Sequence, residues 1–172
     1  MGAYQQNKRI LESDKISLKI RLRLFNAYVT SIFMYNTELW SMPRKFENRI
    51  DVFQRRLLRK ILKIRWPHII PNETLYERTD EIKWSKKIKV RRLRWTGHLH
   101  RLPDDAPARQ ALREALIPAP RPPGRPKTTW ISTVNKDLKD IDPNLRLGDA
   151  ALDEIASDRP RWRSLIQREA QC

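Results

Sequence analysis

The chain has 172 residues, enough for one domain or a domain with an appendage, and its composition, with only four glycines, favours helix over sheet. It carries 36 Lys and Arg against 20 Asp and Glu, which gives a net charge of +16 and a pI near 10.5. The excess lies in residues 1–102, with 24 basic against 9 acidic side chains, whereas residues 103–172 hold 12 against 11. This asymmetry indicates an anionic partner, either a nucleic acid or a membrane surface.

Several classes of protein are not expected. The single cysteine, Cys172, cannot build a disulfide framework, so an intracellular location in the nucleus or cytoplasm is the expectation. No window approaches the roughly 18 uncharged apolar residues of a membrane-spanning helix. The N-terminus lacks the apolar core of a signal peptide, so secretion is not expected.

Residues 1–12 are interpreted as a basic lead-in to the first long helix. Ser13 or Ser17 is the expected cap of this helix, which should run to about Tyr35 and be the most buried element of the chain. Its expected core stripe is Ile16, Ile20, Leu24, Tyr28 and Ile32, widened by Leu22, Phe25, Val29 and Phe33.

A second amphipathic helix is predicted over residues 44–65. Its core stripe should be Phe46, Ile50, Phe53, Leu57, Ile61 and Ile64. Cations line its polar side, and the helix dipole favours them by only a few tenths of a kcal/mol each, which does not account for so many. The candidate nucleic-acid-binding residues of this helix are Arg49, Arg55, Arg56, Arg59, Lys60 and Lys63.

A third long helix is predicted within residues 80–102, after a short one over 72–79 for which Asn72 is the expected N-cap. The apolar residues Trp84, Ile88, Trp95, Leu99 and Leu102 fall on one stripe. The adjacent stripe supplies a second set of candidate nucleic-acid-binding residues, namely Lys83, Lys87, Arg91, Arg94, His98 and Arg101. Two helices that each pair an apolar with a basic stripe favour contact with nucleic acid over ordinary solvated faces.

The rest of the chain predicts short helices and one linker. A helix is expected over 108–116, and the five prolines of residues 117–129 predict an extended linker. Its Arg121, Arg125 and Lys127 suit either a phosphate backbone or a solvated spacer. Thr129, Asp149 and Asp158 are expected to cap three further helices. The sequence thus predicts an all-α fold, with a basic helical bundle over 13–116, the linker, and a small helical appendage over 130–172.

The chemistry of an active site is not visible in the sequence. The three histidines have no partner cysteines at zinc spacing. Asp104 and Asp105 sit in a proline-bounded helix stop without a strand pattern, so they are not interpreted as the paired aspartates of a polymerase. No catalytic residue, metal or cofactor is therefore predicted for this chain.

Four strings, in order, carry a resemblance that covers residues 16–172. They are KIRLRLFNAYVTSIFMYNTELW, FQRRLLRKILKIRWPHIIPNETLYERT, RRLRWTGHLHRLPDD and GRPKTTWISTVNKDL. Together they resemble the C-terminal, thumb and post-thumb part of reverse transcriptases from non-LTR (LINE-type, RTE-like) retrotransposons.

The resemblance implies a role in a larger polyprotein. The parent would be an endonuclease and RNA-directed DNA polymerase whose endonuclease and palm lie upstream of Met1. The catalytic aspartates and their Mg²⁺ would belong to that palm, so this chain alone is expected to be inactive. The thumb of the family is a helical bundle that holds the template–primer duplex, which implies RNA, DNA or an RNA–DNA hybrid as the partner.

The expected mechanism is neutralisation of backbone phosphates by Lys and Arg, with little reading of base sequence. Trp84 and Trp95 are interpreted as packing residues, whereas Trp66 and Trp130 could each stack on a base or simply close a helix end. One alternative is an interaction module that uses its apolar faces for protein partners. Others are a relic that no longer folds and, less favoured, a peripheral membrane protein.

Overall fold

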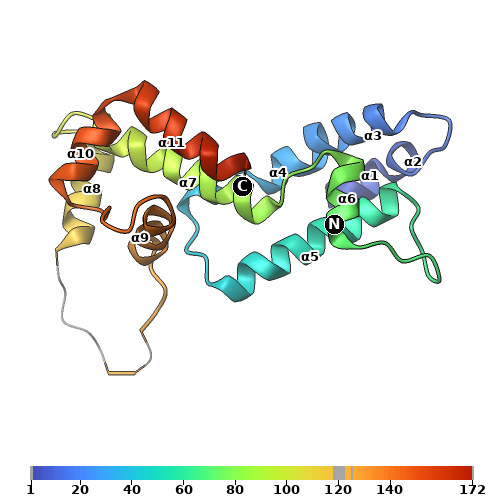
Figure 1. Cartoon of the computed structure of the whole chain (residues 1–172), viewed down its shortest axis with the longest axis horizontal. Helices are drawn as coiled ribbons and strands as arrows, with labels where there is room; N and C mark the ends of the chain where they lie inside the picture. Colours follow the sequence, from blue (N-terminus) through green and yellow to red (C-terminus); the bar gives the residue numbers. More distant parts are fainter. Residues whose placement is uncertain (1, 118–122, 125, 172) are drawn as a thin grey trace. The chain divides into compact units, whose positions relative to one another are not determined.

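The computed structural model describes residues 2–117, 123–124 and 126–171. Helices dominate this part of the chain and no strand occurs in it, which confirms the predicted all-α class. The chain divides into two compact units (Figure 1). Unit 1 contains residues 1–37 and 45–85, and unit 2 contains residues 38–44 and 86–172.

Unit 1 is built from short N-terminal helices, one interrupted helix and the long helix α5 (Arg44–Ile61). The interrupted helix begins as α3 (Leu18–Phe25), widens into the π-helical segment η1 (Asn26–Thr30) and ends as α4 (Ser31–Phe33). Ser17 stands at its N-cap position without a side-chain hydrogen bond. The remaining helices of the unit are α1 (Gly2–Gln6), α2 (Lys8–Leu11) and α6 (Asn72–Thr79).

The core of unit 1 centres on the indole of Trp84, which is fully buried. Phe33 stacks on it with ring centroids 4.3 Å apart, and Phe25 and Phe53 lie 5.9 and 6.0 Å away. Such aromatic contacts add to the free energy gained from burying the rings themselves. Trp84 therefore joins the interrupted helix, α5 and the start of α7 (Trp84–Arg101) in one core.

The interrupted helix presents a different face to this core than the one expected. Phe25 and Val29 are buried, but Ile20, Tyr28 and Ile32 of the expected core stripe are 50%, 51% and 64% exposed. The helix is apolar over much of its circumference, so its pattern did not decide which face packs inward. The expectation that it is the most buried element was wrong.

The N-terminal residues are also more than a basic lead-in. Tyr4 and Leu11, on α1 and α2, are each only 1% exposed. The Tyr4 hydroxyl donates a hydrogen bond of 2.9 Å to Glu12 Oε1. Burial, reinforced by that carboxylate, raises the pKa of the Tyr4 phenol. Residues 2–12 thus belong to the core of unit 1.

Unit 2 contains most of α7 together with α8 (Pro107–Leu116), α9 (Trp130–Ile141), α10 (Ala150–Ser157) and α11 (Arg159–Gln171). Its core joins α7 to the C-terminal helices through buried apolar side chains. They are Val90, Leu93, Val134, Leu138, Leu145, Leu147, Leu152, Trp162 and Ile166. This division differs from the expected bundle over 13–116 with a separate appendage over 130–172, because α7 is apolar on more than one side and packs against α9 and α11.

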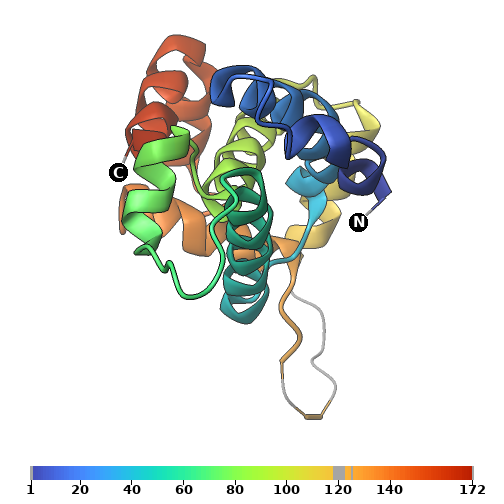
Figure 2. The ribbon, with the colours of Figure 1, turned by 90° about the vertical axis from the view of Figure 1, so that its right-hand side faces the viewer.

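Figures 1 and 2 show the red C-terminal helix, α11, beside the yellow-green α7, and a glycine permits their close approach. A Cβ atom added at Gly97 would lie 2.1 Å from Nε1 of Trp162, which is itself buried. The same indole nitrogen donates a 3.1 Å hydrogen bond to the carbonyl of Leu93, one turn earlier on α7. Gly97 therefore makes room for the indole that joins α11 to α7.

The helix caps of unit 2 follow the sequence well. Thr129 and Ser132 form a reciprocal capping box at the start of α9. The Asp158 carboxylate accepts from the backbone N–H of Arg161 at 3.1 Å, as expected of a cap. Asp149 occupies the N-cap position of α10, but its side chain makes no capping hydrogen bond.

Candidate nucleic-acid interface

One face of α5 and its C-terminal turn carries the first group of predicted binding residues. We call this surface, made of Arg49, Arg55, Arg56, Arg59, Lys60 and Lys63, the α5 basic face. Arg49, Arg56, Lys60 and Lys63 are exposed, while Arg55 and Arg59 are half-buried. Spacings of seven and four residues place Arg49, Arg56 and Lys60 along one side of α5, with Arg55 and Arg59 beside them and Lys63 just past the end of the helix.

The opposite side of α5 is fixed by buried polar side chains. Gln54 Oε1 accepts from the backbone N–H of Trp84 at 2.9 Å, and Gln54 Nε2 donates to the carbonyl of Ile82 at 2.9 Å. The Asp51 carboxylate accepts from the backbone N–H of Ser85 at 3.0 Å and from its hydroxyl at 2.7 Å. Together these contacts satisfy the first N–H groups of α7 and place a negative charge at the positive end of its dipole.

The C-terminal end of α5 is equally well defined. Lys63 adopts a left-handed conformation with φ of 56°, and Ile64 N–H donates to the carbonyl of Arg59 at 2.9 Å. This pattern is a Schellman motif, which usually has glycine at the left-handed position. In addition, Arg21 Nη1 donates to the carbonyl of Ile61 at 2.6 Å. The basic face is therefore carried by a helix whose rotation and end are both fixed.

The cations of this face have few carboxylate partners. Among the described residues, Lys63 forms an ion pair with Asp14, which holds the pKa of that carboxyl below its usual value. Arg49 lies 6.0 Å above the ring of Phe46 and Lys60 lies 5.8 Å from the ring of Tyr4. Arg56 has no hydrogen-bond, ion-pair or ring partner in this part of the chain. The face is thus an exposed positive surface whose charges are mostly uncompensated by nearby acids.

Two adjoining hollows follow the face. One, of about 460 Å³, is lined by Val52, Arg55, Arg56, Arg59, Lys60, Ile64 and Asn72. The other, also about 460 Å³, is lined by Lys45, Asn48, Arg49, Val52, Phe53 and Arg56. Arg56 and Val52 belong to both, so the hollows continue into each other along α5. A concave, positively charged surface of this kind suits a run of phosphates better than a single small anion.

Some of these lining residues were not predicted from the sequence. Asn72 was expected to cap α6, but the N-cap position is Pro71, and Asn72 Oδ1 instead accepts from Arg59 Nη2 at 2.8 Å. Lys45 lies in the first turn of α5, where the basic stripe gave no reason to include it. The adjacent Tyr76 has its pKa raised by burial, with Arg55 opposing the shift.

The second predicted group, on α7, has a different environment. Arg91 Nε lies 3.1 Å from Glu38 Oε2, and Arg101 Nη1 donates to the carbonyl of Ala156 at 2.7 Å. Partial burial would raise the pKa of Glu38, but backbone hydrogen bonding and Arg91 outweigh it and hold the pKa below its usual value. Lys87 also has an intramolecular partner. Three of the six candidates on this stripe therefore have partners within the fold.

The other candidates of the second group lie at the surface. Lys83, in unit 1, and Arg94 and His98, in unit 2, are exposed. The ring of His98 lies 5.1 Å from that of Trp95. Lys127 of the linker is exposed, whereas Arg121 and Arg125 lie outside the described residues. Arg91 is exposed as well, so exposure does not separate the two groups. Among the described residues, the α5 group is distinguished by its adjoining hollows and by having one member, Lys63, with a carboxylate partner.

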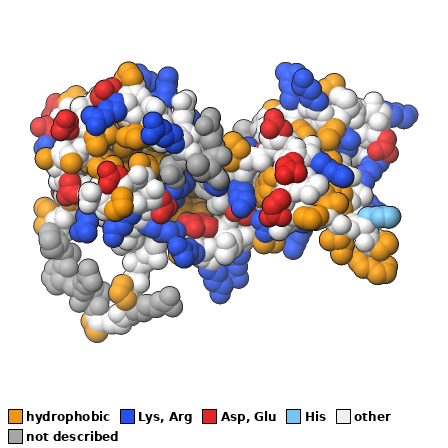
Figure 3. Space-filling model, viewed as in Figure 1, with side chains coloured by type: hydrophobic (Ala, Val, Ile, Leu, Met, Phe, Trp, Pro, Cys, Tyr) orange, Lys and Arg blue, Asp and Glu red, His pale blue; other side chains and the backbone are white. Residues whose placement is uncertain are grey.

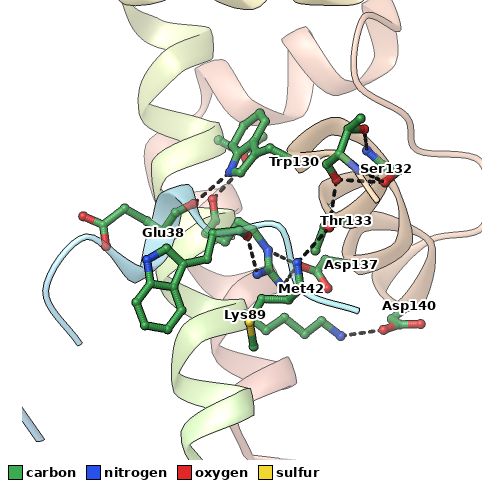
Figure 4. Close-up of polar contacts among 12 residues, drawn as sticks. Glu38, Met42, Lys89, Trp130, Ser132, Thr133, Asp137 and Asp140 are labelled. Atoms are coloured by element: carbon green, nitrogen blue, oxygen red, sulfur yellow. Dashed lines mark hydrogen bonds and ion pairs between the residues drawn. The ribbon is translucent and has the colours of Figure 1, made fainter. Parts of the chain in front are cut away.

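The most buried cation of α7 was not a candidate at all. Arg92 is 1% exposed, and its Nε and Nη2 atoms each lie 2.6 Å from Asp137 Oδ2 on α9. Residues 38–44 contact the same part of unit 2, where Met42 N–H donates to Thr133 Oγ1 and Trp130 Nε1 to the Glu38 carbonyl (Figure 4). Lys89 and Asp140 form a further ion pair of 2.9 Å in the same view. These cations hold unit 2 together.

The tryptophans of the described residues divide into those that pack inside the fold and one that is exposed. Trp84 and Trp162 are buried, Trp95 is half-buried, and Trp130 uses its indole N–H within unit 2. The packing interpretation of Trp84 and Trp95 is consistent with this, and Trp130 is a packing residue as well. Trp66, in contrast, is 86% exposed and does not close the end of α5.

No group of His, Cys, Asp and Glu among the described residues is arranged to hold a metal ion. Within the same residues, no helix is both long enough and apolar enough to span a membrane. Comparison with protein-family models, curated proteins and solved structures finds no match. The function is therefore argued from the geometry of the α5 basic face.

Proposed function

We propose that the chain binds the phosphate backbone of a nucleic acid, namely RNA, DNA or an RNA–DNA hybrid, through the α5 basic face. The observation that carries this proposal is the run of solvent-facing cations along α5, of which only Lys63 has a carboxylate partner among the described residues. Such cations displace the counterions condensed on a polynucleotide, which favours binding without base-sequence readout. A hybrid of A-like form is recognised by shape and backbone in the same manner.

The resemblance to the thumb and post-thumb part of non-LTR retrotransposon reverse transcriptases agrees with this proposal. In that setting the chain would be the C-terminal fragment of an endonuclease and RNA-directed DNA polymerase, and its partners would include the upstream palm and endonuclease. It would hold the template–primer and contribute no catalytic group or cofactor of its own. The two hollows along α5 then correspond to the surface that receives the duplex backbone.

The direct test is binding of a labelled RNA–DNA hybrid across a salt series, measured by fluorescence anisotropy. We expect log K to fall linearly with log salt, with a slope of about −0.9 for each phosphate contacted. The variant Arg49→Glu with Arg56→Glu removes two exposed cations that have no ion-pair partner in the described structure. It should reduce the steepness of the slope by about 2 or more and weaken binding at least tenfold at low salt.

A matched control changes the same charge elsewhere in unit 1. Lys19→Glu with Arg23→Glu reverses two exposed cations of α3, and a second control, Arg94→Glu, reverses an exposed cation of α7. Both should keep the wild-type slope to within about one phosphate equivalent. Equal loss in all three variants would show a diffuse charge effect and contradict a role for α5. An unchanged slope in folded Arg49→Glu, Arg56→Glu protein would contradict the proposal outright.

A second function is favoured by one specific observation, the exposed apolar stripe of the interrupted helix. Ile20, Tyr28 and Ile32 are 50%, 51% and 64% exposed, and Tyr35, just beyond the helix, is 74% exposed. Lys19 and Arg23 lie beside the start of this stripe and are exposed. Apolar surface flanked by cations suits an amphipathic helix of another protein that carries acidic residues along its apolar face.

This second candidate is tested with two synthetic amphipathic helices that share an apolar stripe and differ in their flanking Glu or Lys residues. The Glu peptide should bind and the Lys peptide should not, and Tyr28→Ser with Ile32→Ser should abolish binding in calorimetry. If the chain instead forms a dimer that the same variant dissociates, the stripe is a self-association surface and the acidic-helix candidate is wrong. Nucleic-acid binding should be unaffected by this variant.

A further inference from the structure

The loop between α5 and α6 exposes two large apolar side chains. Trp66 is 86% exposed and Ile69 is 76% exposed, the highest values among the large hydrophobic residues of the described chain. Figure 3 shows hydrophobic side chains gathered at the surface where Figure 1 draws this loop, beside a histidine. An indole left in water gains no free energy from burial, so the fold alone gives no reason for its position.

Trp66 also lacks the contacts that the other tryptophans have. Trp84 is surrounded by phenylalanine rings, Trp162 donates to the Leu93 carbonyl, and Trp130 donates to the Glu38 carbonyl. Trp66 has neither a ring partner nor a hydrogen bond among the described residues. Its flat faces are therefore open to an external group.

The loop begins where the α5 basic face ends. Ile64 lines the first hollow together with Arg59 and Lys60, and Trp66 follows it by two residues. Two residues of extended chain span at most about 7 Å, so the backbone of Trp66 lies within about that distance of Ile64 at the edge of the hollow. Lys63 and Arg65 on either side of Ile64 are exposed and add positive charge at this end.

From this juxtaposition we infer that Trp66 stacks on an unpaired base of a nucleic acid whose backbone lies along the α5 basic face. The inference rests on the proposed function and deepens it, because it assigns the end of the face to single-stranded nucleic acid. Bases inside a duplex are already stacked on both neighbours, whereas a base in a single strand or an overhang offers an uncovered face to the indole. The preferred ligand is thus a duplex with a single-stranded extension.

The test compares Trp66→Ala, Trp66→Phe and wild type on two labelled oligonucleotides, a blunt RNA–DNA hybrid and the same hybrid with a short overhang. Trp66→Ala should weaken binding of the overhang substrate by about 5- to 100-fold, the range expected for loss of one stacked base. Trp66→Phe should retain most of the affinity, and the blunt hybrid should bind all three proteins within twofold. The salt slope should stay the same, because Trp66 contacts no phosphate.

A thermodynamic cycle separates stacking from other effects. An overhang with an abasic site at each unpaired position keeps the sugar–phosphate backbone and removes the bases, so wild type should lose the same factor as Trp66→Ala. Combining the abasic overhang with Trp66→Ala should cost nothing further. Additive losses, or an unchanged affinity of folded Trp66→Ala for the overhang substrate, would overturn the inference.

Failure of the inference and failure of the proposed function give different signatures. If α5 does not bind phosphates, Arg49→Glu with Arg56→Glu leaves the salt slope unchanged whatever Trp66 does. If only the stacking role is wrong, that slope still falls while Trp66→Ala has no effect. Loss of binding to phosphatidylserine vesicles in Trp66→Ala with Ile69→Ala, together with unchanged oligonucleotide binding, would instead assign the loop to a membrane surface and overturn the inference.

Discussion

Helices α5 and α7 both carry basic stripes, but the fold pairs more of the cations of α7 with acidic side chains. On α5 most of the cations face solvent, and Asp51, one of the two acids of this helix, is buried against the start of α7. On α7, Arg92, Lys89 and Arg91 pair with Asp137, Asp140 and Glu38 of unit 2, whereas Arg94 and His98 are exposed. Figure 3 shows acidic and basic side chains interspersed on the visible surface of unit 2. A basic stripe is therefore available to an external anion mainly where the rest of the fold brings few acids to it.

The net charge of each unit does not distinguish the environment of α5 from that of α7. Unit 1 has 16 Lys and Arg against 8 Asp and Glu, and unit 2 has 20 against 12, so each carries a net charge of +8. What differs is the distance from each cation to a carboxylate on another element. Arg92 illustrates the extreme case, because a guanidinium that is 1% exposed has to be paired.

The difference between the cations of α7 and those of α5 is tested most directly by removing one cation from each helix. Arg92→Met should lower the free energy of unfolding by about 3–5 kcal/mol, because it leaves Asp137 charged and buried. Arg56→Met, on α5, should change it by no more than about 0.5 kcal/mol. Urea unfolding followed by circular dichroism measures both. The double variant Arg92→Met with Asp137→Leu should recover much of the loss, and a failure to recover would show that the pair does more than neutralise itself.

A second prediction concerns the close packing of α11 on α7 at Gly97. Gly97→Ala should destabilise the protein by about 1–3 kcal/mol, because the new methyl group would overlap the buried indole of Trp162. Thermal unfolding measures the change. Combining it with Trp162→Leu should make the alanine substitution nearly neutral, since the overlapping ring is then absent. A destabilisation by Gly97→Ala that persists in the Trp162→Leu background would contradict this explanation.

The smallest expected effect is a dependence of the folding stability on pH that arises from His100 on α7. Burial lowers the pKa of His100, although Asp153 Oδ1, 2.5 Å from its Nδ1, opposes the shift. The unfolded chain then binds more protons below about pH 6.5, so stability should fall as pH drops from about 6.5 toward the folded-state pKa, by less than 1.4 kcal/mol per pH unit.

The control for this dependence is His100→Gln, which should flatten the stability profile between pH 7 and 5. The pKa of Asp153 also shifts: burial would raise it, but hydrogen bonds from His100 and Arg109 lower it, so its contribution is lost only at more acidic pH. Oligonucleotide binding by α5 should not change between pH 7 and 5, because that face contains only Lys and Arg. An equally steep stability profile in His100→Gln would contradict the assignment to His100.

The sequence predicted the helices better than it predicted their partners. Periodicity and caps located α5, α6, α7, α8 and α9, and Thr129 caps as expected because its hydrogen bonds are local. Which face of residues 18–33 is buried could not be inferred, because apolar side chains surround that helix. The stabilising pair of Arg92 and Asp137 joins residues 45 positions apart, and periodicity within one helix contains no information about such a contact.

The candidate site shows the same limit. The six cations of the α5 basic face were predicted from spacing, and the structure places all of them on or directly after one helix. The contribution of Asn72 to the hollow was not predictable, because an asparagine before a short helix has the same appearance as a cap. The exposure of Trp66 could not be predicted from the sequence either, because a tryptophan before proline is compatible with both a packed helix end and a free loop.

Two cations of the α5 basic face also hold the beginning of the chain. Lys60 lies against the ring of Tyr4 and Lys63 pairs with Asp14, so residues 4–14 and a bound polynucleotide require the same two side chains. A phosphate that takes Lys63 releases Asp14, and one that takes Lys60 removes the cation from Tyr4. In the proposed function, ligand binding would therefore compete with anchoring of the N-terminal helices. The free energy spent in loosening α1 and α2 would be subtracted from the affinity, and occupancy of the face would be reported by faster amide exchange at the N-terminus.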